Sequence, residues 1–397
     1  MPADSTSPSP QSAPADQASP ARRRRIVRLS WAAGLAAVAL AVPAAAYGIA
    51  GGFSGNASSP ANAAQHPVSY KAGQRFALKH AVGLKAAAGS TDPDYVAYVS
   101  AAGGEQVVEI DVATDTILKT FSADSTYGAA ATPANSQVFI AETGQYQVIA
   151  ANPATGAETP IYVGPYPQDV AVSPDGSQVY ATVTGGDTGP GGSDVVAVIS
   201  TATDKVTGDI KVGPGPRQVV FSPDGSRAYV TTENGVTVID TASGTVINRV
   251  SIPAGAQGVA VSPDGTTLYV TSPNTNALLV IDAATGQITD RISAGQEPFG
   301  VAVTPDGSQL YVADLNANEV SVISTATGKV TGTIAVGRQP ASVAVTPDGS
   351  QVWVGNILDG DVTVIDPATN TVLGSVLQGV GTANYQDAPL GISFVQS

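Results

Sequence analysis

Short runs of alternating hydrophobic and polar residues fill the C-terminal three quarters of the chain. Within residues 299–337, the runs at 300–303, 309–312, 319–323 and 330–334 each have the length of a β-strand. The first is a small apolar run, and 319–323 alternates apolar and polar residues as a half-buried strand does. The segment between the first two runs reads Thr-Pro-Asp-Gly, which is typical of a tight turn. The connections are too short to hold a crossover helix, so the pattern predicts antiparallel strands in groups of four.

This four-strand unit recurs along the chain. Pro-Asp-Gly stands at Pro174, Pro223, Pro263, Pro305 and Pro347, with weaker copies at Pro93 and Pro133, at intervals of 40, 41, 49, 40, 42 and 42 residues. Seven copies with a period near 41 predict an all-β fold, a seven-bladed β-propeller of four-stranded antiparallel blades. The first strand of each copy is rich in Val and Ala, so we expect it to lie innermost, where the blades converge.

The two ends of the repeat region complement each other. Residues 386–394 repeat the lead-in and first strand of a unit, whereas the N-terminal unit begins at its second strand, residues 95–99. We therefore expect the C-terminal strand to complete the first blade, which closes the ring and removes an open sheet edge. The propeller is predicted to span residues 91–397.

The repeat also resembles a known family. Tyr229-Val230-Thr231-Thr232, Tyr269-Val270-Thr271-Ser272 and the Pro-Asp-Gly turns are similar to the forty-residue propeller repeats named YVTN, found in cell-surface and surface-layer proteins of bacteria and archaea. The likeness covers about 307 of 397 residues. It implies the propeller fold and a cell-surface location, but no particular activity, because propellers support many functions.

The first 90 residues have a different composition. Residues 1–21 are rich in Ser, Pro, Ala and Gln, which predicts a disordered tail. A basic cluster that begins at Arg22 precedes an uncharged, largely apolar run, so residues 22–53 are predicted to be a transmembrane or signal segment. Residues 54–90 are predicted to be a flexible spacer.

Two interpretations of the export segment stay open. Residues 29–53 are long enough to be a retained helix that spans the membrane. Alternatively, Ala44-Ala45-Ala46 supplies the small residues of a cleavage site near Ala46, directly after Pro43. The arginines also resemble the twin-arginine export pattern, so the export route is open too. Either way, the propeller is placed outside the cytoplasmic membrane.

Composition and charge restrict the chemistry. The chain has no Cys, and both His residues, His66 and His80, precede the propeller, which excludes thiolate zinc sites and Ser-His-Asp or Cys-His catalysis within the ring. Residues 1–80 carry a net charge of +6 and residues 81–397 of −20, which argues against nucleic acid as a partner. We expect no cofactor. Ca²⁺ or Mg²⁺ has no specific motif, and Asp187 and Asp194 in the long 185–194 insertion are weak candidate ligands.

The better candidates are residues that vary where the repeat is otherwise regular. They precede each inner strand, and we expect them to gather at one mouth of the channel, where Arg side chains could hold an anionic group. The candidate ligand-binding residues are Tyr166, Gln168, Asp169, Arg217, Gln257, Glu297, Phe299, Arg338 and Asp387.

Two functions follow as hypotheses. The first is a membrane-tethered binding module at the cell surface, whose partner is a protein, a cell-envelope polymer or a small anionic ligand. The second resembles the lactonase-type propeller hydrolases, in which carboxylates hold a divalent metal that activates water. The lack of His and Cys in the ring favours binding. Three or more clustered carboxylate or amide oxygens in the channel would favour the hydrolase.

Overall fold

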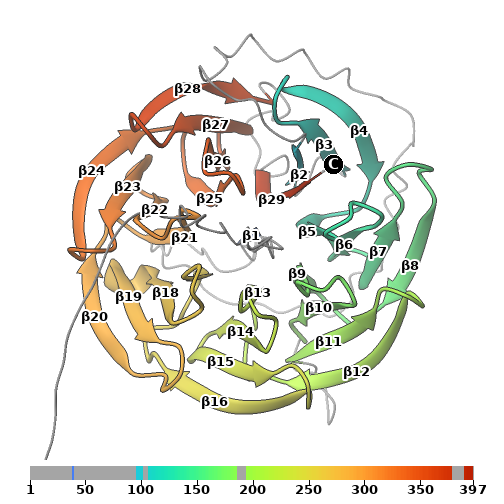
Figure 1. Ribbon diagram of the computed structural model, residues 1–397. Helices are drawn as coiled ribbons and strands as arrows, with labels where there is room; N and C mark the ends of the chain where they lie inside the picture. The colour runs from blue at the N-terminus through green and yellow to red at the C-terminus, as the bar shows by residue number, and fades with distance from the viewer. Residues whose placement is uncertain (1–37, 40–94, 102–105, 186–193, 378–388, 397) are drawn as a thin grey trace, which may run out of the picture. The chain divides into compact units, whose positions relative to one another are not determined.

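The computed structural model describes residues 38–39, 95–101, 106–185, 194–377 and 389–396. Seven antiparallel sheets, here called blades 1 to 7, follow one another around a common axis (Figure 1). Strands β29, β5, β9, β13, β21 and β25 lie near that axis, and β4, β8, β12, β16, β20, β24 and β28 form the rim. The predicted seven-bladed propeller of four-stranded blades is confirmed.

The strands of each blade are given from the axis outward. Blade 1 is β29 (Pro389–Gln396), β2 (Tyr95–Ala101), β3 (Gln106–Asp111) and β4 (Thr116–Ser122); blade 2 is β5 (Thr126–Ala131), β6 (Val138–Glu142), β7 (Gln147–Ala151) and β8 (Glu158–Tyr162); blade 3 is β9 (Pro167–Val172), β10 (Gln178–Val183), β11 (Val195–Ser200) and β12 (Lys205–Lys211).

The remaining blades have the same order. Blade 4 is β13 (Val219–Phe221), β14 (Arg227–Thr232), β15 (Gly235–Asp240) and β16 (Thr245–Ser251); blade 5 is β17 (Val259–Val261), β18 (Thr267–Ser272), β19 (Ala277–Asp282) and β20 (Ile288–Ser293), with the 3₁₀ turn η1 (Pro273–Thr275); blade 6 is β21 (Pro298–Val303), β22 (Gln309–Asp314), β23 (Glu319–Ser324) and β24 (Lys329–Ala335); blade 7 is β25 (Pro340–Val345), β26 (Val352–Asn356), β27 (Asp361–Asp366) and β28 (Thr371–Val376).

The chain ends close the ring as predicted. Strand β29 pairs antiparallel with β2, with Ile392 opposite Val99 and Phe394 opposite Ala97. Blade 1 is thus built from both ends of the propeller, and its inner strand comes last in the sequence.

The predicted N-terminal segments lie almost wholly outside the described residues. Within 22–53, only β1 (Val38–Ala39) is described, and there the backbone is extended and pairs with β29, not helical. The tail at 1–21 and the spacer at 54–90 are outside the described residues. Among the residues that the structure describes, no helix is long and apolar enough to cross a membrane.

The hydrophobic core lies between neighbouring blades. Phe139 of blade 2, for example, packs in one buried cluster with Val170 and Val179 of blade 3. The second and third strands are buried on both faces, so they read as nearly continuous apolar runs. Each rim strand is largely exposed but turns one apolar side chain inward: Phe121, Ile161, Ile210, Val250, Ile292, Ile334 and Val376.

Hydroxyl groups add polar links between blades. Ser100, Thr182, Thr231 and Thr271 occupy equivalent positions on second strands, and each donates to a backbone carbonyl in the inner-strand region of the next blade. The acceptors are Tyr127, Arg217, Gln257 and Phe299, at 2.6, 2.7, 2.9 and 2.5 Å. Because these four hydroxyl residues are fully buried, each link gives a buried donor its acceptor.

The Pro-Asp-Gly turns are structural. Asp175 Oδ1 accepts hydrogen bonds from Ser173 Oγ at 2.6 Å and from the Ser177 N–H at 3.0 Å, and these bonds lower the pKa of Asp175. Gly176 follows with φ of +74°, and a β-carbon there would lie 3.1 Å from Pro133 of the preceding blade's turn. The turns of successive blades therefore pack against one another, and we call this end of the ring the turn face.

The exposed rim strands are protected against further strand pairing. In six blades, the register between the third and the rim strand shifts at a β-bulge. The rim strand of blade 2 pairs without a shift and instead contains Pro160, which has no N–H to donate. Bulges and prolines are both known devices that discourage edge-to-edge aggregation.

Candidate ligand-binding site

The candidate residues lie at the end of the ring opposite the turn face. This end, called here the lead-in face, is formed by the segments before each inner strand and by the hairpins between second and third strands. The two are joined by backbone hydrogen bonds, such as Leu315 N–H to the Glu297 carbonyl at 3.1 Å. The described lead-ins share a residue with positive φ at the same position: Ser125, Tyr166, Gly215, Gly255, Glu297 and Gln339.

Polar side chains gather at the inner-strand starts of blades 3, 4 and 5. Gln168 is buried there, and the Arg217 guanidinium donates to the side-chain oxygen of Gln257 on the next blade. We call Gln168, Asp169, Arg217, Gln218 and Gln257 the polar arc. The structure thus brings two of the predicted residues, Arg217 and Gln257, into contact across blades 4 and 5.

Asp169 is buried in the inter-blade wall of this arc. Its Oδ1 accepts the Val170 N–H at 2.8 Å, and its Oδ2 accepts the Val219 N–H of blade 4 at 3.0 Å. Burial raises the pKa of Asp169 well above its usual value, although the two backbone hydrogen bonds oppose that shift. Both carboxyl oxygens are already used by the protein, so Asp169 joins two blades.

Gln218 joins blades 4 and 5 in the same way, but one of its two side-chain polar groups has no partner among the described residues. Its Oε1 accepts the Val259 N–H of blade 5 at 2.7 Å, but its buried Nε2 has no hydrogen-bond partner among the described residues. The side chain is 1% exposed. A buried amide donor without a partner is unfavourable, so this group marks a position where a ligand oxygen or a water would be held.

The opposite side of the lead-in face is apolar. Residues from blades 6, 7, 1 and 2 pack together there, and we call them the apolar arc: Phe299, Leu315, Ala341, Ile357 and Leu390, with Tyr127 beside them. Phe299 was predicted as a site residue on sequence, and the structure places it in this arc. The starts of the inner strands are thus polar on one side and apolar on the other.

Three predicted residues contact the hairpins between second and third strands. Arg338 forms an ion pair with Asp359 at 2.7 Å, on the hairpin of its own blade. Glu297 accepts a hydrogen bond from the Asn316 side chain, also on a hairpin. Tyr166 is 45% exposed and contacts the ring of Tyr146. The structure therefore does not bring Arg338 and Arg217 together to hold one anion.

The weak metal candidates gain no support. Asp187 lies outside the described residues, as does Asp387, which was predicted as a ligand-binding residue. Asp194 is half-buried, and its Oδ1 accepts the Gly215 N–H at 3.4 Å. Within the described ranges, no three His, Cys, Asp or Glu side chains come close enough to hold a metal ion.

Gln218 was not among the nine candidates, although the sequence carries a signal for it. At the equivalent position the repeat has Gly128, Gly258, Gly300 and Gly391, with Ser342 in blade 7. A β-carbon on Gly258 would lie 2.5 Å from the Phe299 carbonyl oxygen. Only Asp169 and Gln218 place a long side chain where the repeat is otherwise small.

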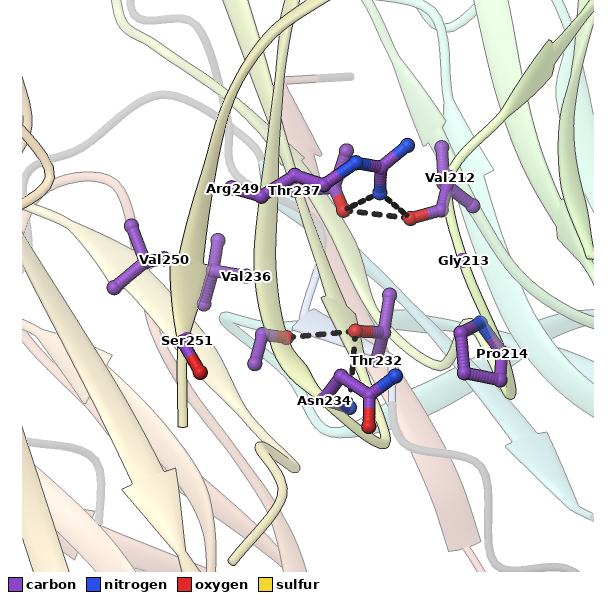
Figure 2. Close-up of a pocket in the computed structure, with 11 residues that line it drawn as sticks. Val212, Gly213, Pro214, Thr232, Asn234, Val236, Thr237, Arg249, Val250 and Ser251 are labelled. Carbon is purple, nitrogen blue, oxygen red and sulfur yellow. Dashed lines mark hydrogen bonds between the residues drawn. The ribbon is translucent and has the colours of Figure 1, made fainter. Parts of the chain in front are cut away.

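A separate pocket of about 240 Å³ lies between blades 3 and 4 (Figure 2). It forms beside Pro214, where the blade 4 hairpin is only two residues long, Glu233-Asn234. Figure 2 shows Arg249 directed across one side, where it donates to the Val212 carbonyl and to Thr237 Oγ1. Backbone and Val side chains form most of the remaining lining, so the pocket offers little specific chemistry.

Comparisons with known proteins agree with the fold. Residues 192–336 match the family described as "Lactonase, 7-bladed beta-propeller", and residues 302–388 match "YNCE-like beta-propeller". Each match covers less than half of the chain. No curated protein matches the sequence.

Solved structures also resemble this chain. Hydrazine synthase from Kuenenia stuttgartiensis is 22% identical with a TM-score of 0.63, over 68% of this chain and 92% of that one. A protein of unknown function from Desulfotomaculum acetoxidans is 14% identical with a TM-score of 0.62, over 76% of this chain and 99% of that one. At these identities, the likeness shows the propeller fold alone.

Proposed function

We propose that this protein is an exported, membrane-tethered β-propeller that binds a ligand at the lead-in face, between the polar and apolar arcs. The ligand carries an anionic group, a carboxylate or a phosphate, joined to an apolar part. The observation that carries this proposal is the buried Nε2 of Gln218, a donor without a partner among the described residues, in the residue that follows Arg217 in the sequence.

Charge and hydrogen bonding support an anionic group. A ligand oxygen that accepts from Gln218 Nε2 would recover the free energy lost by burying that donor. Arg217 supplies a positive charge in a ring region that is otherwise strongly acidic, so an anion would be held there in preference to other positions on the ring. Phe299 and Leu390 in the apolar arc would contact the rest of the ligand.

Export is proposed from the sequence. The cluster that begins at Arg22 precedes an uncharged run of the length of a membrane span, and a small-residue site ends at Ala46. N-terminal sequencing of the mature protein distinguishes the two interpretations. We expect the uncharged run to be retained in the mature protein. A mature chain that starts near Tyr47 would show instead that the segment is cleaved and that the propeller is secreted.

Ligand binding can be tested with matched probes. Isothermal titration calorimetry would compare medium-chain carboxylates and alkyl phosphates with the corresponding neutral amides and alcohols. We expect the anionic members to bind about tenfold or more tightly than their neutral partners, because charge-assisted bonds to Arg are strong. Arg217→Gln and Gln218→Met should both weaken binding, whereas Arg291→Gln on the rim strand β20 should not. Equal binding of charged and neutral probes would contradict the proposal.

A hydrolase is the second candidate, favoured by the match of residues 192–336 to the lactonase propellers. The described residues lack a carboxylate cluster for a metal, and both oxygens of Asp169 are engaged by backbone N–H groups. Hydrolysis of aliphatic and sugar lactones, measured by pH-stat with and without added Ca²⁺, Mg²⁺ or Mn²⁺, tests this candidate directly. Turnover that disappears in Asp169→Asn would favour the hydrolase over the binding module.

A further inference from the structure

Three tyrosines are exposed side by side on the outer part of the lead-in face. Tyr146, Tyr162 and Tyr166 are 38%, 70% and 45% exposed, whereas the tyrosines at 98, 180, 229, 269 and 311 are buried. The Tyr146 and Tyr166 rings meet edge to face, with centroids 5.3 Å apart and an interplanar angle of 78°. Tyr146 belongs to the blade 2 hairpin, and Tyr166 to the lead-in of blade 3.

Both paired tyrosines occupy an unfavourable backbone conformation. Tyr146 has φ of +61° and Tyr166 of +50°, in the left-handed region that bulky side chains rarely adopt. The repeat fills these positions differently elsewhere. Gly215 and Gly255 stand at the position of Tyr166, and the other described blades have the non-aromatic Ser125, Glu297 and Gln339 there. Gly360 stands at the position of Tyr146 in blade 7. Glycine reaches this conformation without the steric penalty of a β-carbon.

Tyr146 also stands where two other blades have an Asn that accepts a hydrogen bond from the lead-in of the next blade. In blade 5, Asn276 Oδ1 accepts the Glu297 N–H at 2.9 Å, and in blade 6, Asn318 Oδ1 accepts the Gln339 N–H at 2.9 Å. The equivalent donor here is the Tyr166 N–H, for which a tyrosine has no amide oxygen to offer. The chain therefore keeps two exposed aromatic rings at a junction where Asn and Gly would be more stable.

We propose that Tyr146, Tyr162 and Tyr166 form a binding surface for a neutral saccharide. Aromatic ring faces pack against the C–H faces of sugar rings, and the phenol hydroxyl groups meet the sugar hydroxyls. Gln145 and Asp124 flank the pair, with Gln145 Nε2 3.0 Å from Asp124 Oδ2, and supply further hydrogen-bonding groups.

Charge selects the class of saccharide. Residues 81–397 carry a net charge of −20, so an anionic polymer would be repelled by the ring as a whole. The side chains that flank the tyrosines are an amide and a carboxylate, neither of which attracts an anion. A neutral polymer avoids this repulsion. This saccharide surface is separate from the ligand site proposed at the polar arc, because the three tyrosines are exposed to solvent whereas Gln218 and Gln257 are buried.

Affinity electrophoresis of the full chain in mild detergent tests the proposal. The gels contain hydroxyethylcellulose, laminarin or mannan, with polygalacturonate as the anionic counterpart, and a proline-rich decapeptide is titrated separately. We expect at least one neutral polysaccharide to retard the protein. Tyr162→Ala and Tyr166→Ala should each weaken that interaction about fivefold to tenfold, as expected for the loss of one aromatic contact.

Tyr146→Asn separates binding from folding. Asn restores the acceptor that blades 5 and 6 use, so this variant should unfold at a higher temperature than the wild type while it loses retardation. Leu118→Ala, which removes a side chain 53% exposed on the rim strand β4, should change neither the retardation nor the fold. The proposal is overturned if no neutral polysaccharide retards the protein, if the Tyr variants are retarded like the wild type, or if only the peptide or polygalacturonate binds.

Discussion

Replacement of Asp314 by Asn should make the propeller more stable at neutral pH. Asp314 ends β22 beneath the blade 6 hairpin, where it is fully buried. Its Oδ2 accepts a hydrogen bond from Ser321 Oγ at 2.6 Å, and its Oδ1 has no partner among the described residues. Burial raises the pKa of Asp314 to about 6, with a further contribution from the nearby Glu319 carboxylate.

The sign of the effect follows from proton linkage. Because the folded protein holds the Asp314 proton more tightly than the unfolded chain, this group makes the protein less stable as the pH rises from about 4 to above 6. The rise from 3.8 to about 6, at roughly 1.4 kcal/mol per pH unit, sets an upper limit of about 3 kcal/mol at pH 7.5. Asn carries no charge, so the difference between variant and wild type should vanish near pH 4 and grow toward neutral pH.

Blade 7 shows how the amide is accommodated. Asn356 stands at the equivalent position, and its Nδ2 donates to Asp361 Oδ1 at 2.9 Å and to Thr363 Oγ1 at 2.8 Å. Glu319 and Ser321 are the corresponding acceptors in blade 6, so Asp314→Asn has partners in place.

Urea unfolding between pH 4 and 8 measures this effect, followed by the fluorescence of the buried Trp353. The reciprocal variant Asn356→Asp is the control, and it should lose stability as the pH rises. A difference between Asp314→Asn and wild type that does not vary with pH, or a variant less stable than the wild type at pH 7.5, would refute the reasoning.

Three further changes test the packing between blades. Gly258→Ala should lower the free energy of unfolding by about 2 kcal/mol, because the added β-carbon would press on a carbonyl of the next blade. The control is Gly208→Ala, which has open space around it and should change thermal unfolding little. Thr231→Val should destabilise by about 1–3 kcal/mol in urea titrations, since it leaves the buried Gln257 carbonyl without that donor. Deletion of 389–397 removes the inner strand of blade 1, so limited proteolysis should degrade the truncated chain much faster than the full one.

The repeat architecture could be predicted because it depends on local signals. The Pro-Asp-Gly turns fix where each unit begins, the period gives the number of blades, and the unpaired strand at 386–394 predicts ring closure. These features require no knowledge of which side chains meet across blades. For the same reason, the small inner strands were correctly expected near the axis.

The candidate site was harder to predict because its contacts cross between loops. Arg338 precedes an inner strand like Arg217, yet a hairpin of its own blade brings Asp359 to it and neutralises its charge. Asp169 lies in the polar arc, where its carboxylate accepts the backbone N–H of Val219 in the next blade, a contact that the sequence pattern does not reveal. Both outcomes depend on distances between elements that the repeat pattern does not encode.

The deviations from the repeat are concentrated in one sector of the ring, and this supports a functional origin. Blades 2 to 4 hold the exposed pair Tyr146 and Tyr166 and the long side chains of Asp169 and Gln218, whereas blade 5 keeps Gly255, Asn276 and Gly258 at the corresponding positions. Each blade of a propeller contacts only its two neighbours, so local destabilisation in one sector is tolerated by the rest. A ring with seven uniform blades would satisfy the fold equally well. Tyr146, Tyr166 and Gln218, which weaken the repeat in adjacent blades, are therefore best explained by what they bind.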